Sequence, residues 1–489
     1  MLKRRLQLFA IMMITLMISS EFFLHGRGTI LLMPFVLLTY AIATIFLRTK
    51  QDVLLNIMVA YGMSHFHFAT KAGMLGPWIV LAYFLLSFNV LGKFRNVFRT
   101  QAHYFLIIVF LLFNLLGLLF NNPNTSFENL TSFVSLIGLA LTFYLLTRLY
   151  YNAEDIQFII YVFGIMITYT FLSSMNNGLG LFRTSSPLVT LSEQYFADKF
   201  VVPMFGRSFG EYFLCMNLFF AAMIVTPAIR GAKKNYYTAF YLMSFLGCLV
   251  GFSKAQTLIL VIGNIIIFAF SSVGISAKKL ISVTLIIGAL AFVLIIGQSY
   301  FNLTFIFERF AEQPDLFKNV FENPFTAEGT SRDESFYWGL RRNIDNNSVV
   351  GYGWSPADAN NAAYFHGMNI NIRKHDFHSL YLSVFPVFGW VAGSIFFFWL
   401  ATFLTRAYKI CFSFVKGNHS LIGKSFLGLA VAFLLAEYAI PVTSEANYFF
   451  ILIVWMGIVN GIYYTARQNV LTSHISSEII DSPLRRNIK

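Results

Sequence analysis

The sequence is short of charge, and this shortage excludes an ordinary water-soluble protein. Only 12% of its 489 residues are charged, whereas soluble globular domains carry about 25%. Hydrophobic residues make up 57% of the chain, and 57 residues are phenylalanines. Such a chain would dissolve poorly in water, but its composition suits a protein whose solvent is lipid. We therefore expect an integral membrane protein.

Cysteine is also scarce, which excludes a disulfide framework. Cys215, Cys248 and Cys411 are far apart and lie in or beside apolar runs, and the sequence has no CxxC pair of the metal-binding kind. Aspartate and glutamate are scattered through the long polar stretch after residue 300, without the clustered spacing of a divalent-cation site. We therefore expect neither a metal nor another cofactor.

The net charge of +13 does not by itself indicate a nucleic-acid partner. Lysine and arginine cluster in the short breaks between apolar runs, where residues that set membrane topology are found. No stretch combines basic residues with interleaved aromatics that could stack on bases. We therefore expect the protein's partner to be the lipid bilayer and expect no nucleic-acid partner.

Long apolar runs follow one another along the chain, and a helix that spans a bilayer needs about 20 such residues. The first run follows Lys3-Arg4-Arg5, as in a signal peptide, but no small-residue cleavage site precedes Glu21, so we expect a retained helix. The stretch 53–69 is weaker, because polar residues interrupt it. The clear runs are 6–24, 29–47, 77–92, 104–120, 131–147, 157–175, 209–228, 236–252, 257–274, 280–299, 379–404, 425–441 and 446–465.

The positions of the basic residues indicate that the stretch 53–69 also crosses the membrane. Basic clusters at 48–50 and 93–99 both belong on the inside, so the chain between them must cross twice. The sequence then predicts an all-α polytopic protein with about fourteen spans (range 12–14) and both termini in the cytoplasm. It divides into transmembrane helices in 1–299 with a minor outer loop at 176–208, a large extracytoplasmic loop at 300–377, transmembrane helices in 378–466, and a cytoplasmic tail at 467–489.

The large loop at 300–377 is where we expect the chemistry. It is too polar to span a membrane and too long to be a simple connector. It contains Trp338, Tyr352 and Trp354, so it is not a low-complexity segment. We expect it to fold against the membrane-embedded helices and to carry active-site residues.

Arg332 lies in the first turn of a helix predicted within this loop. Ser331 and Glu334 match a capping box, which indicates that the helix begins there. Free backbone N–H groups and the positive end of the helix dipole make such a position suitable for a phosphate or a diphosphate. The alternative is an exposed surface helix whose arginine pairs with Asp333 or with a lipid headgroup.

His378 is expected in the first turn of the following span. The positive potential of the helix start, with Arg373 and Lys374 nearby, favours the neutral imidazole that a general base requires. Asp376 can cap the helix or fix the tautomer of the histidine. The alternative is a histidine at the membrane interface that contacts only headgroups and water.

Arg207 and Lys254 are expected at the same outer level as His378. Arg207 lies at the outer start of a span, and Lys254 lies in a very short outer turn. An arginine at this depth can simply extend to the interface, or it can hold a lipid diphosphate just above the bilayer. With Arg332, three cations and a histidine from separate segments would then lie on one face of the membrane.

These residues belong to segments that occur in a definite order between about 200 and 400. They are Arg207 to Gly210 with Asn217 beyond it, Ser253-Lys254, Arg332 to Trp338, Gly351-Tyr352-Gly353, and His378-Ser379-x-Tyr381-Leu382 followed by Gly389 and Gly393. In this order they resemble the O-antigen polymerase and O-antigen ligase superfamily of bacterial envelope glycosyltransferases. The last segment, with a long outer loop before it, is the most specific. Lys254 departs from the family, which often has arginine there.

The resemblance implies metal-independent, inverting glycosyl transfer on the outer face of the bacterial cytoplasmic membrane. The donor and acceptor would be oligosaccharides on undecaprenyl diphosphate. Arg207, Arg332 and Lys254 would hold the diphosphate, and His378 would act on the acceptor hydroxyl, supported by Asp376 and Tyr381. A chain-length regulator and a flippase are candidate partner proteins.

Two alternatives to a polymerase of O-antigen or capsule remain open. A ligase of the same superfamily would transfer finished glycan to a lipid or protein acceptor. A flippase or transporter of lipid-linked glycan can also have about fourteen spans, but transporters tend to show internal repeats and midplane binding sites. No internal repeat is evident in this sequence, and its distinctive residues are expected outside the membrane.

Overall fold

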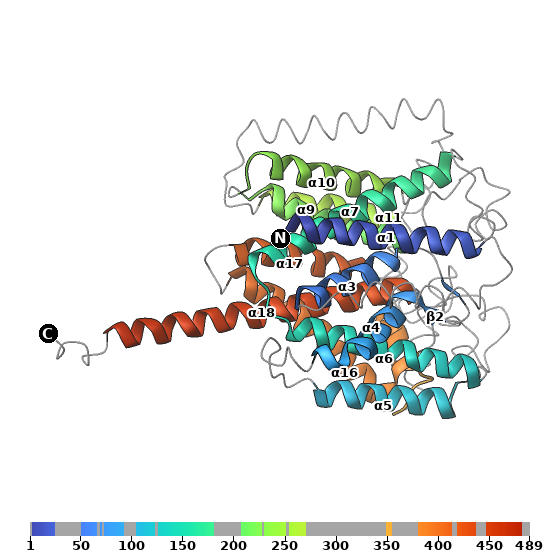
Figure 1. Cartoon of the computed structure of the whole chain (residues 1–489). Helices are drawn as coiled ribbons and strands as arrows, with labels where there is room; N and C mark the ends of the chain where they lie inside the picture. The colour runs from blue at the N-terminus through green and yellow to red at the C-terminus, as the bar shows by residue number, and fades with distance from the viewer. Residues whose placement is uncertain are drawn as a thin grey trace, which may run out of the picture.

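The computed structural model shows a bundle of helices, as expected from the sequence (Figure 1). It describes residues 2–24, 50–65, 69–70, 73–91, 104–122, 126–179, 207–226, 229–250, 254–269, 349–354, 380–412, 418–436 and 446–481. Within these ranges the all-α fold class is confirmed, because the only strands there form one very short hairpin.

Twelve helices are formed by the described residues. They are α1 (Leu2–Leu24), α3 (Lys50–Met63), α4 (Leu75–Leu91), α5 (Tyr104–Phe120), α6 (Ser126–Arg148), α7 (Ala153–Leu179), α9 (Arg207–Ile224), α10 (Ala232–Val250), α11 (Lys254–Ala269), α16 (Leu380–Phe412), α17 (Asn418–Ala436) and α18 (Ala446–Asp481). The hairpin of β1 (Ala69–Thr70) and β2 (Gly73–Met74) is antiparallel, with Ala69 opposite Met74.

The apolar runs of the sequence become these helices. The run expected at 104–120 coincides with α5, whereas α16 and α18 continue well past the ends expected at 404 and 465. The runs expected at 29–47 and 280–299 lie outside the described residues. Four stretches are long and apolar enough to cross a membrane, judged by length and composition among the described residues: Asn129–Arg148, Ala153–Leu172, Val384–Phe412 and Phe449–Asn469.

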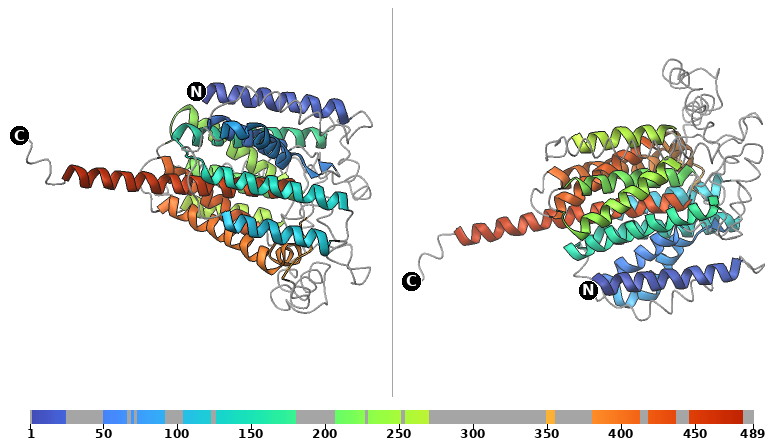
Figure 2. Two further views of the ribbon diagram at one scale, coloured as in Figure 1. Left: turned by 60° about the horizontal axis from the view of Figure 1, so that its bottom comes forward. Right: turned by 90° about the horizontal axis from the view of Figure 1, so that it is seen from above.

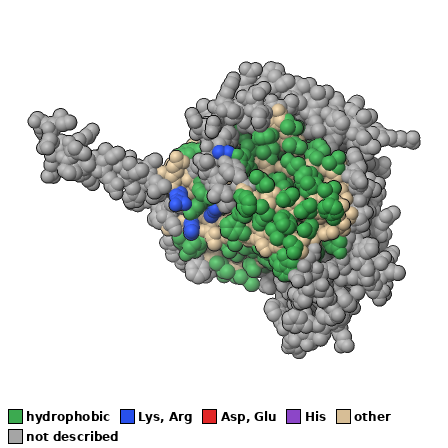
Figure 3. Space-filling model, turned by 90° about the horizontal axis from the view of Figure 1, so that it is seen from below, with side chains coloured by type: hydrophobic (Ala, Val, Ile, Leu, Met, Phe, Trp, Pro, Cys, Tyr) green, Lys and Arg blue, Asp and Glu red, His purple; other side chains and the backbone are tan. Residues whose placement is uncertain are grey.

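The outer surface of the bundle carries large hydrophobic side chains. Figure 3 shows a broad hydrophobic face, with the visible lysine and arginine side chains toward its left edge. Soluble monomers rarely expose continuous apolar patches larger than a few hundred Å², so this surface suits contact with lipid. Exposed members include Phe105, Ile108, Leu112, Leu119 and Phe120 of α5, and Trp390, Phe398, Tyr408 and Phe412 of α16.

Helix α3 is enclosed by its neighbours, although it comes from the least apolar of the expected spans. Every side chain from Val53 to His65 is buried, and α1, α4, α6, α7 and α18 all contact this helix. The helix ends at Met63, where a tight turn over 64–65 leads toward the hairpin. The stretch 53–69 is therefore not one continuous helix, and this part of the sequence prediction was wrong in its boundary.

One end of the bundle, which we call the basic end, collects most of the described basic residues. The starts of α1 and α7 meet there through the ion pair between Arg5 and Asp155, at 2.8 Å. The end of α16 lies beside α18 at the same end, because Arg406 Nη2 donates to the Tyr464 hydroxyl at 2.8 Å. The basic residues on helices that start or finish here are Lys3, Arg4, Arg5, Lys50, Arg148, Arg230, Lys233, Lys234, Arg406, Lys409, Lys424 and Arg467.

The other end of the bundle, which we call the opposite end, holds the two remaining described basic residues. Arg207 and Lys254 are the first residues of α9 and α11. Helix α16 also begins at this end, because the Tyr381 hydroxyl donates to the carbonyl oxygen of Leu434, near the end of α17, at 2.5 Å. Among the described residues, the two ends of the bundle thus differ sharply in the number of basic residues.

Helix α18 runs through the bundle and continues beyond it. Its described part extends unbroken to Asp481, so the expected boundary at 466 between span and tail is not a break in the helix. Figures 1 and 2 show this C-terminal part projecting past the ends of the other helices, on the side where α1 begins. Both described chain ends therefore lie toward the basic end.

Candidate functional site

Two helices that begin with basic residues start at the same depth at the opposite end. Asn264 Nδ2 of α11 donates to Asn217 Oδ1 of α9 at 2.8 Å. Each asparagine lies ten residues after the first residue of its helix, which is about 15 Å at 1.5 Å per residue. Arg207 and Lys254 therefore occupy equivalent levels above this hydrogen bond.

Helix α10 keeps α9 and α11 in this register. It runs antiparallel to α9, with Phe213 against Gly247 near one end and Phe220 against Tyr237 near the other. Asn217 Nδ2 also donates to the carbonyl oxygen of a residue in α10, Tyr241, at 3.1 Å. Polar hydrogen bonds of this kind join helices where lipid offers no alternative partner.

The first turns of α9 and α11 can attract an anion. The first N–H groups of a helix have no partner within it, and the helix dipole adds positive potential there. A phosphate group suits such a position, particularly where a basic side chain is the first residue. Arg207 and Lys254 hold these positions in the backbone, although the sequence analysis expected Lys254 in a turn just before its helix, and their side chains lie outside the described part.

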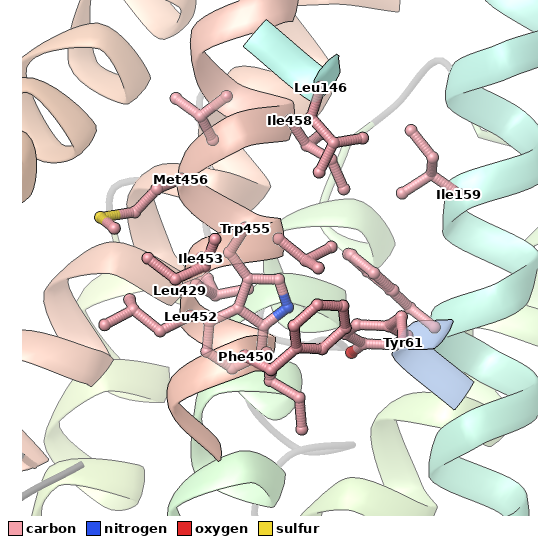
Figure 4. Close-up of a cluster of buried hydrophobic side chains, with 14 of the residues drawn as sticks. Tyr61, Leu146, Ile159, Leu429, Phe450, Leu452, Ile453, Trp455, Met456 and Ile458 are labelled. Carbon is pink, nitrogen blue, oxygen red and sulfur yellow. The ribbon is translucent and has the colours of Figure 1, made fainter. Parts of the chain in front are cut away.

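Beneath the start of α9 lies a buried cluster of aromatic side chains with hydrogen-bonding groups. The Tyr61 hydroxyl of α3 donates to the Tyr212 hydroxyl of α9 at 3.3 Å. The His65 ring stands edge-on to the Tyr212 ring at 4.6 Å, and His65 Nδ1 lies 2.9 Å from the carbonyl oxygen of Tyr61. Trp455 of α18 stacks on Tyr212 and lies beside Tyr61 in Figure 4. These buried side chains pack together inside the bundle, below the level of Arg207.

Helix α16 is broken close to where it begins. Pro386 supplies no backbone N–H, and Gly389 has φ 74° and ψ 175°, which is not helical. The normal ladder of hydrogen bonds is therefore interrupted around these residues. In a membrane protein, freed backbone groups must find partners elsewhere in the protein.

Segment 349–354 supplies these partners. The Tyr352 N–H donates to the carbonyl oxygen of Pro386 at 3.0 Å, and the Gly353 N–H donates to that of Val387 at 2.8 Å. The loop expected at 300–377 was predicted to fold against the membrane-embedded helices, and these residues of it do so. The remaining residues of that loop lie outside the described part.

Glycine makes this docking possible because the two backbones nearly touch. A Cβ atom placed on Gly351 would lie 2.3 Å from the backbone nitrogen of Gly389, and one on Gly389 would lie 2.4 Å from that of Gly351. Gly353 and Gly389 also have positive φ values of 79° and 74°, which favour glycine. The Gly351-Tyr352-Gly353 segment and Gly389, both singled out in the sequence, are thus brought into direct contact.

Helix α5 holds the same segment from the other side. Asn121 Nδ2, just past the end of α5, donates to the carbonyl oxygens of both Val350 and Gly351 at 3.0 Å. Asn114 Oδ1 of α5 accepts from the Trp354 N–H at 3.3 Å. The segment is therefore clamped between α5 and the break in α16.

Of the predicted site residues in the last motif, only Tyr381 is described. Its hydroxyl is bonded to α17 and its ring stacks on Phe397 at 6.3 Å. These contacts tie the start of α16 to the bundle, and a supporting role for Tyr381 in chemistry stays a prediction. Arg332, Asp376 and His378 lie outside the described residues, so their meeting with Arg207 and Lys254 also stays a prediction.

No group of three or more histidine, cysteine, aspartate or glutamate side chains among the described residues could hold a metal ion. Cys215, Cys248 and Cys411 are all buried and free of disulfides.

Sequence reasoning missed several residues that build this region. Asn114, Asn121 and Asn264 were not singled out, and neither was Pro386. For Asn114, Asn264 and Pro386 the signal was present, because an asparagine or a proline within an apolar run is costly unless a neighbouring helix or loop supplies a partner; Asn121 lies just past the end of its run and gave no such signal. What the sequence could not reveal is which partner each residue has.

The length, composition and apolar exterior of these helices are those of an integral membrane protein. The comparisons with known proteins do not narrow this class. The sequence matches no protein-family model, and it matches no curated protein.

Proposed function

We propose that this protein is a membrane glycosyltransferase that polymerises oligosaccharide repeat units carried on undecaprenyl diphosphate into O-antigen or capsular polysaccharide. The proposal rests on the resemblance of the ordered segments between about 200 and 400 to the O-antigen polymerase and ligase superfamily. The observation that carries it is that α9, α11 and α16, which follow or contain three of these segments, all begin at the opposite end.

The charge difference between the two ends supports an orientation. Because basic residues collect on the cytoplasmic side, the basic end would face the cytoplasm and the opposite end would face outward. Both termini would then be cytoplasmic, in a protein of about fourteen spans in the bacterial cytoplasmic membrane. The site would lie on the extracytoplasmic face, where lipid-linked glycans are assembled.

In the proposed reaction, an acceptor hydroxyl attacks the anomeric carbon of the donor glycan. The bond between that carbon and the diphosphate oxygen breaks, and the undecaprenyl diphosphate leaves with the bonding electrons. His378 takes the proton from the acceptor hydroxyl as general base, while Asp376 and Tyr381 support it.

The leaving diphosphate would be held by Arg207, Arg332 and Lys254. Charge-assisted hydrogen bonds from these cations strengthen as the leaving oxygen gains negative charge. The first turns of α9 and α11 would add backbone N–H groups to this binding site. Because the cations neutralise the leaving group, the reaction requires no metal.

Ligase activity uses the same site with a different acceptor. A ligase would move finished glycan to a lipid or protein, whereas a polymerase adds one repeat-unit chain to another. The polysaccharide profile of cells lacking the protein separates the two. A ladder collapsed to one repeat unit indicates a polymerase, and free polymer that is not attached to its lipid or protein acceptor indicates a ligase.

A flippase is the alternative from a different class. The test is to supply purified protein in detergent with purified undecaprenyl-diphosphate oligosaccharide and to size the products. A transferase makes longer glycans in detergent, whereas a flippase requires a sealed bilayer and leaves glycan length unchanged. Failure to elongate in detergent, together with transport in vesicles, would refute the proposed function.

A further inference from the structure

We propose that Asn121 and the break in α16 are positioning elements that hold segment 349–354 and thereby set the position of the first turns of α16, which follow His378 directly in the sequence. The catalytic consequence rests on the proposed function, whereas the docking itself does not. Neither Asn121 nor the break has a role in the chemistry derived above.

The docking is built from several independent contacts rather than from one. Two backbone N–H groups of the segment satisfy carbonyl oxygens at the α16 break, and Asn121 holds two carbonyl oxygens of the segment. From α5, the backbone at Gly117 approaches so closely that a Cβ atom there would lie 2.6 Å from the Gly351 carbonyl oxygen. Such complementarity fixes one position of the segment, because a shift would break the hydrogen bonds and cause backbone overlap.

The last residue of the docked segment and the first residue of α16 are both anchored inside the bundle. Trp354 is fully buried, and its ring lies 5.2 Å from that of Phe449 in α18. Leu380, at the start of α16, is fully buried as well. His378 lies between these two anchors in the sequence, only two residues before Leu380. A change in the docking at Pro386 and Gly389 would therefore act on the first turns of α16, which follow His378 directly in the sequence.

Asn121 offers a clean test because its side chain is exposed and yet makes two hydrogen bonds to the segment. Asn121→Ala removes both bonds, and Asn121→Asp places a carboxylate against two carbonyl oxygens. Asn121→Gln keeps the amide donor, and the exposed position has room for one more methylene group. We therefore expect the segment to be held most firmly in the wild type and slightly less firmly in Asn121→Gln. It should be held much less firmly in Asn121→Ala and Asn121→Asp.

Gly389→Ala is the stronger perturbation. The new Cβ atom would meet the backbone nitrogen of Gly351 at 2.4 Å, on a residue with positive φ. Gly428→Ala is the matched control, because its nearest neighbour would be the Leu218 carbonyl oxygen at 3.1 Å in a different part of the bundle. This control shows the effect of a glycine-to-alanine change in a helix when the docking is not disturbed.

The docking is measured first, by hydrogen exchange of the full-length protein in detergent without substrate. Peptides that cover 349–354 should exchange slowly, although they come from a loop, because the Tyr352 and Gly353 amides are bonded into α16. Protection should fall in Asn121→Ala and Gly389→Ala, and persist in Asn121→Gln and Gly428→Ala. Exchange at the rate of an unstructured chain in the wild type would overturn the docking, whatever the protein catalyses.

The kinetic consequence is measured with the same variants and the lipid-linked oligosaccharide. A misplacement of about 1 Å can cost about 100-fold in rate, so Gly389→Ala should lower kcat by about that factor. Asn121→Ala should lower kcat by about tenfold, with recovery in Asn121→Gln. Binding of the donor should change less than kcat, because two of the proposed diphosphate ligands, Arg207 and Lys254, belong to α9 and α11.

The two proposals fail in different ways. If the wild-type protein elongates glycan and the undocked variants do so with unchanged kcat, the positioning role is wrong and the proposed function stands. If all variants bind donor more weakly in parallel with their loss of kcat, the docking is only structural, and the positioning role is again wrong. If the wild-type protein shows the docking but elongates no glycan, the proposed function fails, and the catalytic role of the docking fails with it.

Discussion

The ion pair between Arg5 and Asp155 gives a quantitative test of how the bundle is held together at the basic end. Arg5 Nη1 lies 2.8 Å from Asp155 Oδ1, and its guanidinium carbon lies 4.4 Å from the centre of the Phe158 ring. The other carboxylate oxygen of Asp155 accepts from the Asn152 N–H at 3.1 Å. The pair thus joins α1 to the start of α7, where Asn152 and Asp155 cap the helix reciprocally.

The burial of this pair sets the size of the effect. The side chains are only 6% and 3% exposed, so each charge depends on the other. Removing one partner of a buried pair leaves an uncompensated charge and costs about 3–5 kcal/mol, so Arg5→Met should lower the free energy of unfolding by that amount. Asp155→Leu should cost about 1 kcal/mol more, because it also removes a hydrogen bond of the helix cap.

The double variant Arg5→Met with Asp155→Leu should lose only about 1 kcal/mol, because replacing a buried pair by apolar residues is often neutral. Unfolding by SDS in mixed micelles, followed by tryptophan fluorescence, gives the four free energies of the double-mutant cycle. Arg4→Met is the matched control, since Arg4 is exposed, and it should change stability by no more than about 0.5 kcal/mol. If the losses of the two single variants simply add in the double variant, the two charges do not interact as described.

The remaining predictions concern the proposed reaction. Arg332→Ala should weaken binding of the lipid-linked donor by about 10–100-fold as well as slow turnover, because it removes a charge-assisted contact; donor affinity measured by calorimetry tests this, and unchanged affinity would remove Arg332 from the site. Arg467→Ala is the control, since Arg467 is an exposed residue of α18 near the basic end. EDTA should leave the elongation rate unchanged, and a loss of activity that added magnesium or manganese restores would show that the reaction uses a metal.

Much of the helical framework could be predicted from the sequence. Apolar runs of sufficient length predict helices, which is why α5 coincides with its expected run. The boundary of α3 could not be predicted, because the turn after Met63 interrupts a stretch that remains moderately apolar. The unbroken length of α18 was missed for a different reason. Loss of hydrophobicity after residue 465 predicts where a helix leaves lipid, but a helix can continue into water.

The candidate site could be predicted only in part. The position of Arg207 at a helix start followed from charge and apolar patterning, because it precedes a long apolar run, whereas Lys254 was expected in a turn and is the first residue of α11. The contact between Gly351-Tyr352-Gly353 and Gly389 could not be predicted from the sequence, since it depends on two backbone segments that meet only in the tertiary structure. Local sequence reveals that a glycine or an asparagine is unusual in its place, whereas the identity of its partner is a property of the tertiary structure.

The elongation of lipid-linked oligosaccharide by His378→Ala, compared with the wild type, shows whether His378 is the general base of a glycosyl transfer. Both proteins are purified in detergent and given the same undecaprenyl-diphosphate repeat unit, with donor binding measured in parallel. We expect the variant to bind donor but to make no polymer, because the acceptor hydroxyl lacks its base. Polymer of normal length and amount from His378→Ala would show that His378 is not the catalytic base.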